Sequence, residues 1–306
     1  MQRIVYLDGQ YINENDAKIS IFDRGFLFGD AVYEVTAVIN GKLIENEGHM
    51  LRLQRSCSEL QIALPVTVEE ITSIQEELIK SNQLDEGGIY LQISRGSAGD
   101  RDFGYPGADV KPTLVLFTQA RDLLNSPKAT KGIKVITTED IRWKRRDIKT
   151  VGLLAPCMAK QGALDKHVDD AWLVEDGYIT EGSSNNAYIV TTEGVLVTRP
   201  LSNDILHGIT RKALLELAEK EKIKIEERLF TAEEAYQANE AFVSSATTFV
   251  WPVIEIDGKK IGSGKPGTVA MKLREIYIEL ATQTAELKDG SKPFNKERLD
   301  TQRLAI

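Results

Sequence analysis

The sequence predicts an α+β fold divided into two domains, and three observations carry this prediction. Short apolar and β-branched runs flank turn dipeptides such as Asp8-Gly9 and Asn40-Gly41, which are typical of β-hairpins. Other segments repeat apolar residues every three or four positions, as amphipathic helices do. A polar stretch near the middle of the chain separates two such sets of elements, which indicates a domain boundary.

Composition excludes several classes of protein. The 306 residues include 38 Lys and Arg against 46 Asp and Glu, a net charge of −8, so the chain as a whole does not attract nucleic acid or an anionic membrane. Cys57 and Cys157 lie far apart, as do the three histidines, which argues against a disulfide framework and a local metal site. The first residues lack a signal-peptide pattern and no long apolar run occurs, so we expect a cytoplasmic protein without a membrane span.

The smaller domain is predicted to comprise residues 1–118. Met50, Leu53 and Cys57 recur at helical spacing and predict a first helix, and a second is expected at residues 68–82. The loop 95–107 is rich in glycine and too irregular for the interior of an element. The expected strands are residues 4–7, 10–12, 32–39, 42–44, 89–94 and 113–118.

The linker is predicted at residues 119–131, which are polar and include Asn125, Ser126 and Pro127. Residues 132–282 then form the larger, C-terminal domain. Residues 283–306 are mostly polar or charged and predict a peripheral tail. The expected elements of the larger domain are strands 133–137 and 240–244, hairpins turning at Asp176-Gly177 and Glu193-Gly194, and helices 156–166, 210–222 and 268–282.

Four segments contain candidate chemistry, and the first is the basic run at residues 141–150. Lys149 follows several cations there, just after an expected strand. Like charges nearby disfavour the ammonium form of a lysine, and the neutral amine is the better nucleophile towards a carbonyl. Taken alone, such a run is more often an ordinary basic surface, and that interpretation stays open.

The second and third segments are small and polar. In residues 180–186 the apolar strand pattern breaks, which fits a plain loop or a dry site where Glu181 pairs with a cationic heterocycle. In the third segment Gly208 precedes a helix whose first turn holds Ile209 and Thr210. Main-chain N–H groups and a hydroxyl at a helix N-terminus bind anions, and the same pattern also fits an ordinary helix cap.

The fourth segment combines Arg52, on the first predicted helix, with the hydroxyl-rich run at residues 244–248. A guanidinium that donates two hydrogen bonds at once, together with several hydroxyls, suits a phosphate group. Singly, these residues fit a solvated helix position and a turn. Together, the four segments indicate one ligand that carries a carbonyl, a cationic ring and a phosphate.

Taken in order, these segments and the sequence FDRGFLFGDAVYE at residues 22–34 resemble the fold-type IV pyridoxal 5'-phosphate (PLP) aminotransferases, most closely the D-amino acid aminotransferases. The resemblance covers residues 3–280. It implies a small α/β N-terminal domain and a larger, PLP-binding C-terminal domain with a barrel-like β core. It also implies transfer of an amino group from a D-amino acid to a 2-oxo acid, pyruvate or 2-oxoglutarate, through a Lys149 Schiff base and a quinonoid intermediate.

The resemblance assigns the cofactor-binding residues. Lys149 matches the Schiff-base lysine, and Glu181 matches the carboxylate that pairs with the pyridine nitrogen. Ala246 stands where D-specific members usually have threonine, so one phosphate hydroxyl is lost or is supplied by Thr247. The residues that match phosphate ligands or the apolar contact of the ring are Arg52, Leu206, Ile209, Thr210 and Ser245.

The resemblance also assigns residues that bind the substrate carboxylate. In D-specific members an arginine and a histidine in one loop hold this group together with a tyrosine. Tyr33 matches the tyrosine, Arg101 the arginine and Phe103 the histidine; the loop is one residue longer here, which leaves Arg95 as the second choice. Because Phe103 is apolar and Ala37 replaces a usual Lys or Arg, the carboxylate is expected to be held less firmly.

Other members of the family remain as alternatives. Branched-chain L-aminotransferases usually have glycine at the position of Val35 and arginine at that of Ala37, which disfavours them. (R)-selective amine transaminases share the tyrosine and the valine and are the main alternative, and aminodeoxychorismate lyase is a further one. A binding protein that lost the chemistry is disfavoured because Lys149 and Glu181 are retained. The resemblance further implies a homodimer in which loop 95–107 lies near the neighbouring active site.

Overall fold

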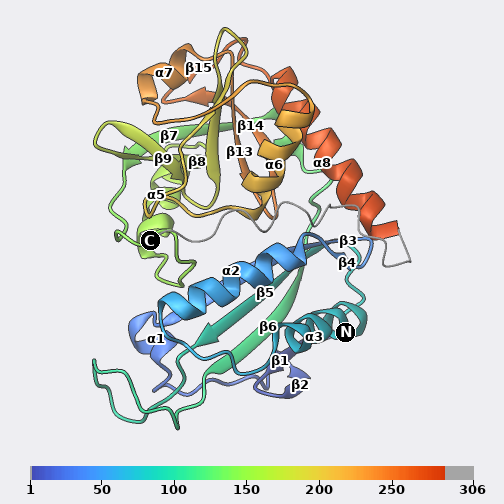
Figure 1. The fold of residues 1–306 in the computed structure, drawn as a ribbon, viewed down its shortest axis with the longest axis vertical. Helices are drawn as coiled ribbons and strands as arrows, with labels where there is room; N and C mark the ends of the chain where they lie inside the picture. The colour runs from blue at the N-terminus through green and yellow to red at the C-terminus, as the bar shows by residue number, and fades with distance from the viewer. Residues whose placement is uncertain (1, 287–306) are drawn as a thin grey trace.

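The protein consists of two β-sheets, each covered by helices, which meet near the middle of the molecule (Figure 1). The computed structural model describes residues 2–286. The strands of the first sheet lie within residues 4–120 and those of the second within residues 133–260, so the sheets follow one another along the chain. Within the described residues, no helix is both long and apolar enough to cross a membrane.

The first sheet has six strands in the order β2-β1-β6-β5-β3-β4, and every neighbouring pair is antiparallel. Both residues of each predicted turn, Asp8-Gly9 and Asn40-Gly41, have positive φ angles, as two-residue hairpin turns require. The two hairpins predicted from these dipeptides are therefore confirmed. The strands are β1 (Ile4–Leu7), β2 (Gln10–Asn13), β3 (Ala31–Ile39), β4 (Lys42–Leu43), β5 (Gly87–Ser94) and β6 (Thr113–Ala120).

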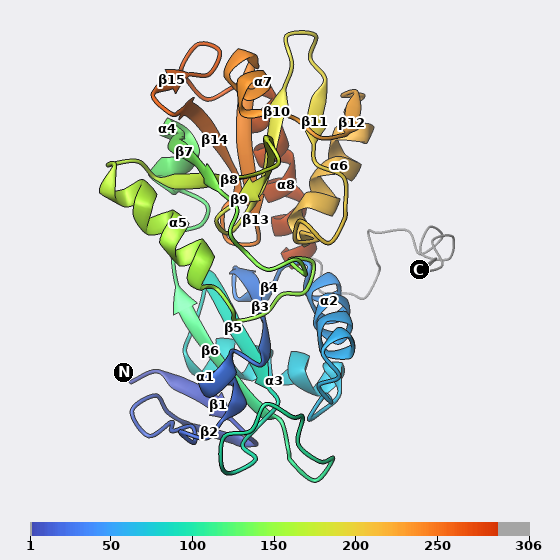
Figure 2. The ribbon, with the colours of Figure 1, turned by 90° about the vertical axis from the view of Figure 1, so that its left-hand side faces the viewer.

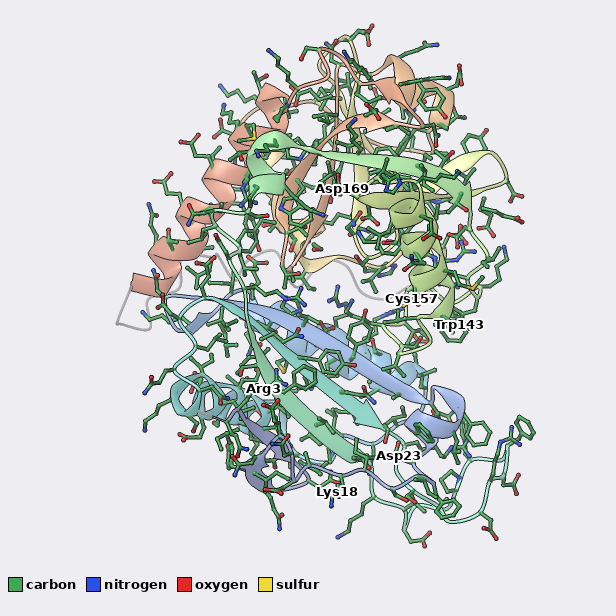
Figure 3. All side chains as sticks on the ribbon, turned by 180° about the vertical axis from the view of Figure 1, so that it is seen from behind. Arg3, Lys18, Asp23, Trp143, Cys157 and Asp169 are labelled. Atoms are coloured by element: carbon green, nitrogen blue, oxygen red, sulfur yellow. The ribbon has the colours of Figure 1, made fainter. Side chains whose placement is uncertain are left out.

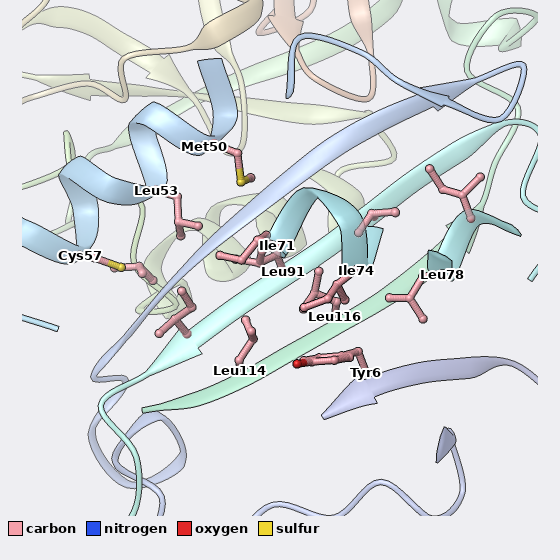
Figure 4. Packing of buried hydrophobic residues seen from close by; sticks show 14 of the residues in the cluster. Tyr6, Met50, Leu53, Cys57, Ile71, Ile74, Leu78, Leu91, Leu114 and Leu116 are labelled. Atoms are coloured by element: carbon pink, nitrogen blue, oxygen red, sulfur yellow. The ribbon is translucent and has the colours of Figure 1, made fainter. Parts of the chain in front are cut away.

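Two long helices pack on this sheet around one apolar core. The helices of this half are α1 (Arg24–Phe28), α2 (Asn46–Glu59) and α3 (Val68–Ser81). Met50, Leu53 and Cys57 on α2 point towards the strands, where Leu91 and Leu116 belong to the same cluster (Figure 4). The helical spacing that predicted α2 thus corresponds to its buried face, and burial of that face holds α2 against the sheet.

The second sheet has nine strands, in the order β12-β11-β10-β13-β14-β7-β8-β9 with β15 paired to β14. It is mixed, because β7 runs parallel to both β14 and β8. The strands are β7 (Ile133–Glu139), β8 (Asp170–Glu175), β9 (Tyr178–Gly182), β10 (Asn186–Val190), β11 (Leu196–Thr198), β12 (Ile225–Glu227), β13 (Glu240–Ser245), β14 (Phe249–Ile256) and β15 (Lys259–Lys260). The sheet curls, so that β9 and β10 at different places in this order also lie close together (Figure 2).

Helices close the second sheet on its outer faces. They are α4 (Pro127–Lys131), α5 (Leu154–Asp165), α6 (Ile209–Lys220), α7 (Ala232–Gln237) and α8 (Thr268–Glu286). Leu214, Leu217 and Ala218 on α6, predicted to share one face, are buried together with Phe242 and Leu273. Figure 2 shows α5 on one side of the molecule, reaching the junction with the first sheet.

The predicted elements are present, and near two of the expected boundaries the helices and strands extend further than expected. The linker was expected at residues 119–131, but β6 continues to Ala120 and α4 begins at Pro127, so only residues 121–126 lack an element. The tail was expected from residue 283, but α8 continues to Glu286, because nothing in its sequence breaks the helix there. The rest of the predicted tail, residues 287–306, lies outside the described residues.

Candidate active site

A cavity of about 480 Å³ lies between the two halves of the molecule and is lined by residues of both. This volume is typical of sites that bind small molecules and cofactors. Trp143, which lines the cavity, and Cys157 are seen beside the junction of the two halves in Figure 3. The predicted site residues that line the cavity are Tyr33, Val35, Arg52, Lys149, Glu181, Leu206, Ile209, Thr210, Ser245, Ala246 and Thr247.

Lys149 is held in place by the first half of the molecule although it follows β7 in the chain. Its carbonyl accepts a hydrogen bond from the Tyr33 N–H at 3.0 Å, and its N–H lies 3.5 Å from the Ser56 hydroxyl on α2. The side-chain amine lies 4.3 Å from the centre of the Tyr33 ring. Among residues 2–286 no carboxylate lies within 4 Å of this amine, so it faces the cavity without an ion pair.

The cations that precede Lys149 in the sequence are each paired with carboxylates, which the sequence alone did not reveal. These pairs are Arg142 with Asp140 and Glu181, Lys144 with Glu175, Arg145 with Glu59 and Asp147, and Arg146 with Glu175. The strand expected at residues 133–137 continues to Glu139 and still ends well before Lys149. The run is therefore an ion-paired loop that crosses the cavity, and Lys149 is its one amine without such a pair among the described residues.

One end of the cavity is built around the carboxylate of Glu181, which is 3% exposed. Its oxygens accept hydrogen bonds from Arg142 Nη1 at 2.6 Å, from Asn186 Nδ2 at 3.0 Å and from the Leu206 N–H at 3.2 Å. Burial raises the pKa of Glu181, against the opposing effect of Arg142. A buried carboxylate in this state favours a cationic or proton-donating partner in the cavity.

The start of α6 lines another part of the cavity. The N–H groups of Ile209 and Thr210 have no acceptor within the described chain, because the first helical hydrogen bond is Lys212 N–H to Gly208 O. A side chain at Gly208 is excluded, since a Cβ there would lie 2.1 Å from Asn186 Oδ1. The backbone can therefore approach a ligand closely at this point, and the helix dipole favours a negative charge.

Hydroxyl groups from the second sheet line the cavity as well. Residues 246–248 form the tight turn between β13 and β14, and the Ser245 and Thr248 hydroxyls are 2.9 Å apart across it. Ser245, Ala246 and Thr247 all line the cavity. The turn therefore presents Thr247 next to Ala246, the position where the resemblance leads one to expect a threonine.

Arg52, on α2, also lines the cavity, and its hydrogen bonds to Glu34 and His207 fix the orientation of its guanidinium. Its Nε and Nη2 donate to the two oxygens of Glu34, each at 2.8 Å, and its Nη1 donates to the carbonyl of His207 at 3.0 Å. Of its five N–H bonds, one on each terminal nitrogen remains for a ligand. Although burial opposes it, Arg52 together with the hydrogen bond from His49 lowers the pKa of Glu34 to about 2.

The structure does not bring the expected substrate-binding loop to this cavity. Tyr33 and Val35 line the cavity, but Arg101 and Phe103 lie on the exposed loop and do not. The Arg101 guanidinium lies 4.7 Å from the centre of the Phe103 ring, and Phe103 is 74% exposed. Arg95, the second choice, is buried, and its donors are used by Asp30 and by two main-chain carbonyls.

Sequence reasoning missed four residues that shape the site. Glu34, His49, Arg142 and Asn186 fix the orientation of the cavity-lining side chains, yet none of them was given a role. Glu34 could have been identified from the sequence, because a carboxylate within the apolar strand β3 needs a buried partner. Arg142 and Asn186 stood inside the segments already singled out, but their partners are distant in sequence and become visible only in the folded chain.

Comparisons with known proteins agree with this geometry. A profile of the family "Amino-transferase class IV" matches residues 31–256. A D-alanine aminotransferase of Staphylococcus haemolyticus is 40% identical over 90% of this chain and 98% of its own length. One from Bacillus licheniformis is 37% identical over 94% of this chain and 99% of its own length.

The fold agrees as well. The structure of a T.th. branched-chain amino acid aminotransferase, complexed with N-(5'-phosphopyridoxyl)-L-glutamate, superposes with a TM-score of 0.82 at 25% identity, over 92% of this chain and 95% of that one. The predicted fold-type IV architecture, with its two domains and curled β core, is confirmed. The chain belongs to the class IV aminotransferases.

Proposed function

We propose that the chain is a PLP-dependent aminotransferase that moves the amino group of a D-amino acid to pyruvate or 2-oxoglutarate. The observation that carries this proposal is that one cavity holds the Lys149 amine without an ion pair, the main-chain N–H groups at the start of α6 and the buried carboxylate of Glu181. Relatives that share up to 40% of their residues with it over nearly their whole length are D-alanine aminotransferases, which supports the D-specificity.

The residues present fit the cofactor. The α6 N-terminus, the Ser245–Thr247 turn and the two remaining N–H bonds of Arg52 would hold its phosphate, and Glu181 would hold the proton on its ring nitrogen. Bound PLP withdraws electrons from the substrate α-carbon, which makes the α-proton acidic. Lys149 would first bind the cofactor through its amine and then, once released, take up this proton and return it.

We propose a homodimer, because the cavity of one chain lacks its predicted carboxylate-binding loop. That loop protrudes from the end of the first sheet, away from the second one (Figure 2). Large apolar side chains that are exposed on the described chain include Phe22, Phe26, Phe103, Leu154 and Met158. A second copy would cover such side chains and bring Arg101 to a cavity. Loss of the dimer in solution with full activity retained would contradict this assembly.

A panel of amino donors tests the function against its alternatives. With pyruvate and 2-oxoglutarate as acceptors, D-alanine and D-glutamate are expected to react at least about 100-fold faster than L-leucine and (R)-1-phenylethylamine, since a lost charged contact and a reversed α-carbon cost a few kcal/mol. (R)-1-phenylethylamine as the best donor would favour the amine transaminase, whose carboxylate-free substrates suit the apolar Phe103. L-leucine as the best donor would favour the branched-chain enzyme. In Arg101→Ala, KM should rise for D-alanine but not for the amine.

A further inference from the structure

One cation at the rim of the cavity has no assigned role, and it is Arg121. The cavity is lined by several arginines and lysines, and in the described chain all but two have a carboxylate within 4 Å. The two exceptions are Lys149, whose amine has a task in the proposed reaction, and Arg121. A guanidinium left unpaired beside a cavity, in a protein of net charge −8, remains available to an anionic ligand.

The absence of a partner for Arg121 has a structural cause. Its main-chain N–H donates to the Glu86 carbonyl at 3.2 Å, which fixes where the residue stands at the end of β6. Oε1 of the Glu86 carboxylate accepts the N–H groups of Leu123 and Leu124 at the start of the connection between the sheets, and this carboxylate forms no ion pair with Arg121 in the described chain. The neighbouring cation of the cavity, Lys128, is already bound to Asp169 at 2.9 Å.

Strand register connects Arg121 with the place where the substrate would sit. Gly88 on β5 pairs with Gln119 on β6, and both line the cavity with Val35. Because side chains alternate along a strand, Arg121 continues the face of Gln119. The cavity wall thus runs from Tyr33 past Val35 and Gly88 to Gln119 and Arg121.

Gly88 marks the middle of this wall. A Cβ on Gly88 would lie in van der Waals contact with its neighbours, 3.5 Å from Val35 Cγ1 and 3.6 Å from Thr247 Cγ2, so the first sheet closely approaches the β13–β14 turn here. β5 contributes no side chain at this point, and Gly88, Gln119 and Arg121 line the same cavity as Tyr33. A substrate anchored at the Tyr33 end therefore has Gln119 and Arg121 within its own cavity.

We propose that Arg121, with the amide of Gln119, binds the side-chain carboxylate of a dicarboxylic substrate. The ligand class is an amino acid or 2-oxo acid with a second carboxylate, such as D-glutamate and 2-oxoglutarate. This inference rests on the proposed function, since it takes the α-carboxylate to lie at the Tyr33 end. Arg121 is then a residue that determines specificity, and the chemistry at Lys149 does not depend on it.

The test compares acceptors in matched variants of the PLP-loaded enzyme. In Arg121→Gln, kcat/KM for 2-oxoglutarate should fall about 10- to 100-fold, as expected for loss of a hydrogen bond to a charged group, while kcat/KM for pyruvate and for 2-oxohexanoate stays within about twofold. Arg121→Lys should retain part of the preference. The control is Lys131→Gln, which removes one exposed charge from α4 without touching the cavity and should change neither acceptor.

The outcomes separate this inference from the proposed function. An equal fall for all acceptors, or no fall for 2-oxoglutarate, would overturn the role of Arg121 and leave the transaminase intact. If the wild-type chain transaminates no pair of substrates, the proposed function fails. The role of Arg121 is then tested by ligand binding alone. Calorimetry should then show glutarate binding at least about 10-fold more tightly than pentanoate, with the difference lost in Arg121→Gln; equal binding of the two would overturn the subsite as well.

Discussion

Two buried glutamate–arginine pairs lie beside the same cavity, and the pKa values of their carboxylates are shifted in opposite directions. Glu34 is 1% exposed and Glu181 is 3% exposed, so burial alone does not separate them. The pKa of Glu34 is lowered to about 2, whereas burial raises the pKa of Glu181 in spite of its arginine. The difference lies in how each arginine divides its donors.

Arg52 donates hydrogen bonds from Nε and Nη2 to Glu34. In the described chain these two nitrogens donate to no second carboxylate. Arg142 gives Nε and Nη2 to Asp140 and only one nitrogen, Nη1, to Glu181. Glu34 is thus a permanent anion that orients Arg52 towards a ligand, while Glu181 keeps an incompletely balanced charge that a ligand can complete. The same two residue types therefore create two different electrostatic environments beside one cavity, which suit the phosphate and the ring nitrogen of the proposed cofactor.

The largest effect is expected from Glu34→Gln, because it leaves the Arg52 charge buried without its partner. The free energy of unfolding should fall by about 3 kcal/mol in urea denaturation. Replacing both residues, with Arg52→Met added, should recover part of this loss, since no uncompensated charge remains. A change below about 1 kcal/mol in Glu34→Gln would show that the pair does not hold this end of the cavity together.

A smaller effect, and one on turnover instead of stability, is expected from Glu181→Gln. The amide cannot hold a proton on a ring nitrogen as a carboxylate does, so kcat should fall about 100-fold. Arg142 keeps its fork to Asp140 in this variant, and the free energy of unfolding should stay within about 1 kcal/mol of the wild type. A loss of stability as large as that of Glu34→Gln, without loss of turnover, would remove the distinction between the two pairs.

The smallest effect concerns a third glutamate, Glu45, which has no arginine partner among residues 2–286. Glu45 precedes α2, and burial together with the charge of Glu216 raises its pKa to about 7, against the influence of Lys212. Its folded pKa thus exceeds the ordinary value of 4.5, so the folded state binds the proton more tightly and stability falls as the pH rises from about 4.5 through about 7.

Glu45→Gln should therefore be more stable than the wild type by about 2 kcal/mol near pH 8, and equal to it near pH 4.5, in urea unfolding at each pH. The control is Glu47→Gln, in the first turn of the same helix, which should not show this gain in stability near pH 8. A wild type whose stability does not fall over this range would mean that pairing with arginine is not what distinguishes the three glutamates.

The sequence predicts the elements of this fold well because their signals are local. Turn dipeptides such as Asp8-Gly9 and the helical repeat of Met50, Leu53 and Cys57 depend on neighbours in the chain. The end of α8 was misplaced because polar residues do not stop a helix unless a breaking residue or a competing cap is present. The site residues followed from the resemblance, and the cavity brings most of them together.

What the sequence could not predict are contacts between distant segments. The cations around Lys149 pair with distant carboxylates such as those of Glu59, Glu175 and Glu181, and no local sequence pattern predicts these pairs. The sequence argument took the cations of the basic run to repel the Lys149 ammonium group. Arg142 and Arg146 form ion pairs, and cations whose charge is compensated in this way exert little repulsion. The place of Arg101 is a further case, because its loop lies away from the cavity of its own chain, an arrangement that the proposed dimer would explain.

The central claim is that Lys149 carries the chemistry and that its donors are D-amino acids, and a single-turnover titration tests it most directly. PLP-loaded protein is mixed with D-alanine or L-alanine without acceptor, and the visible absorption band of the bound cofactor is followed over time. The band should disappear with D-alanine and persist with L-alanine, and Lys149→Ala should slow the change by several orders of magnitude. A band that does not respond to D-alanine, or a Lys149→Ala variant that reacts as fast as the wild type, would contradict the claim.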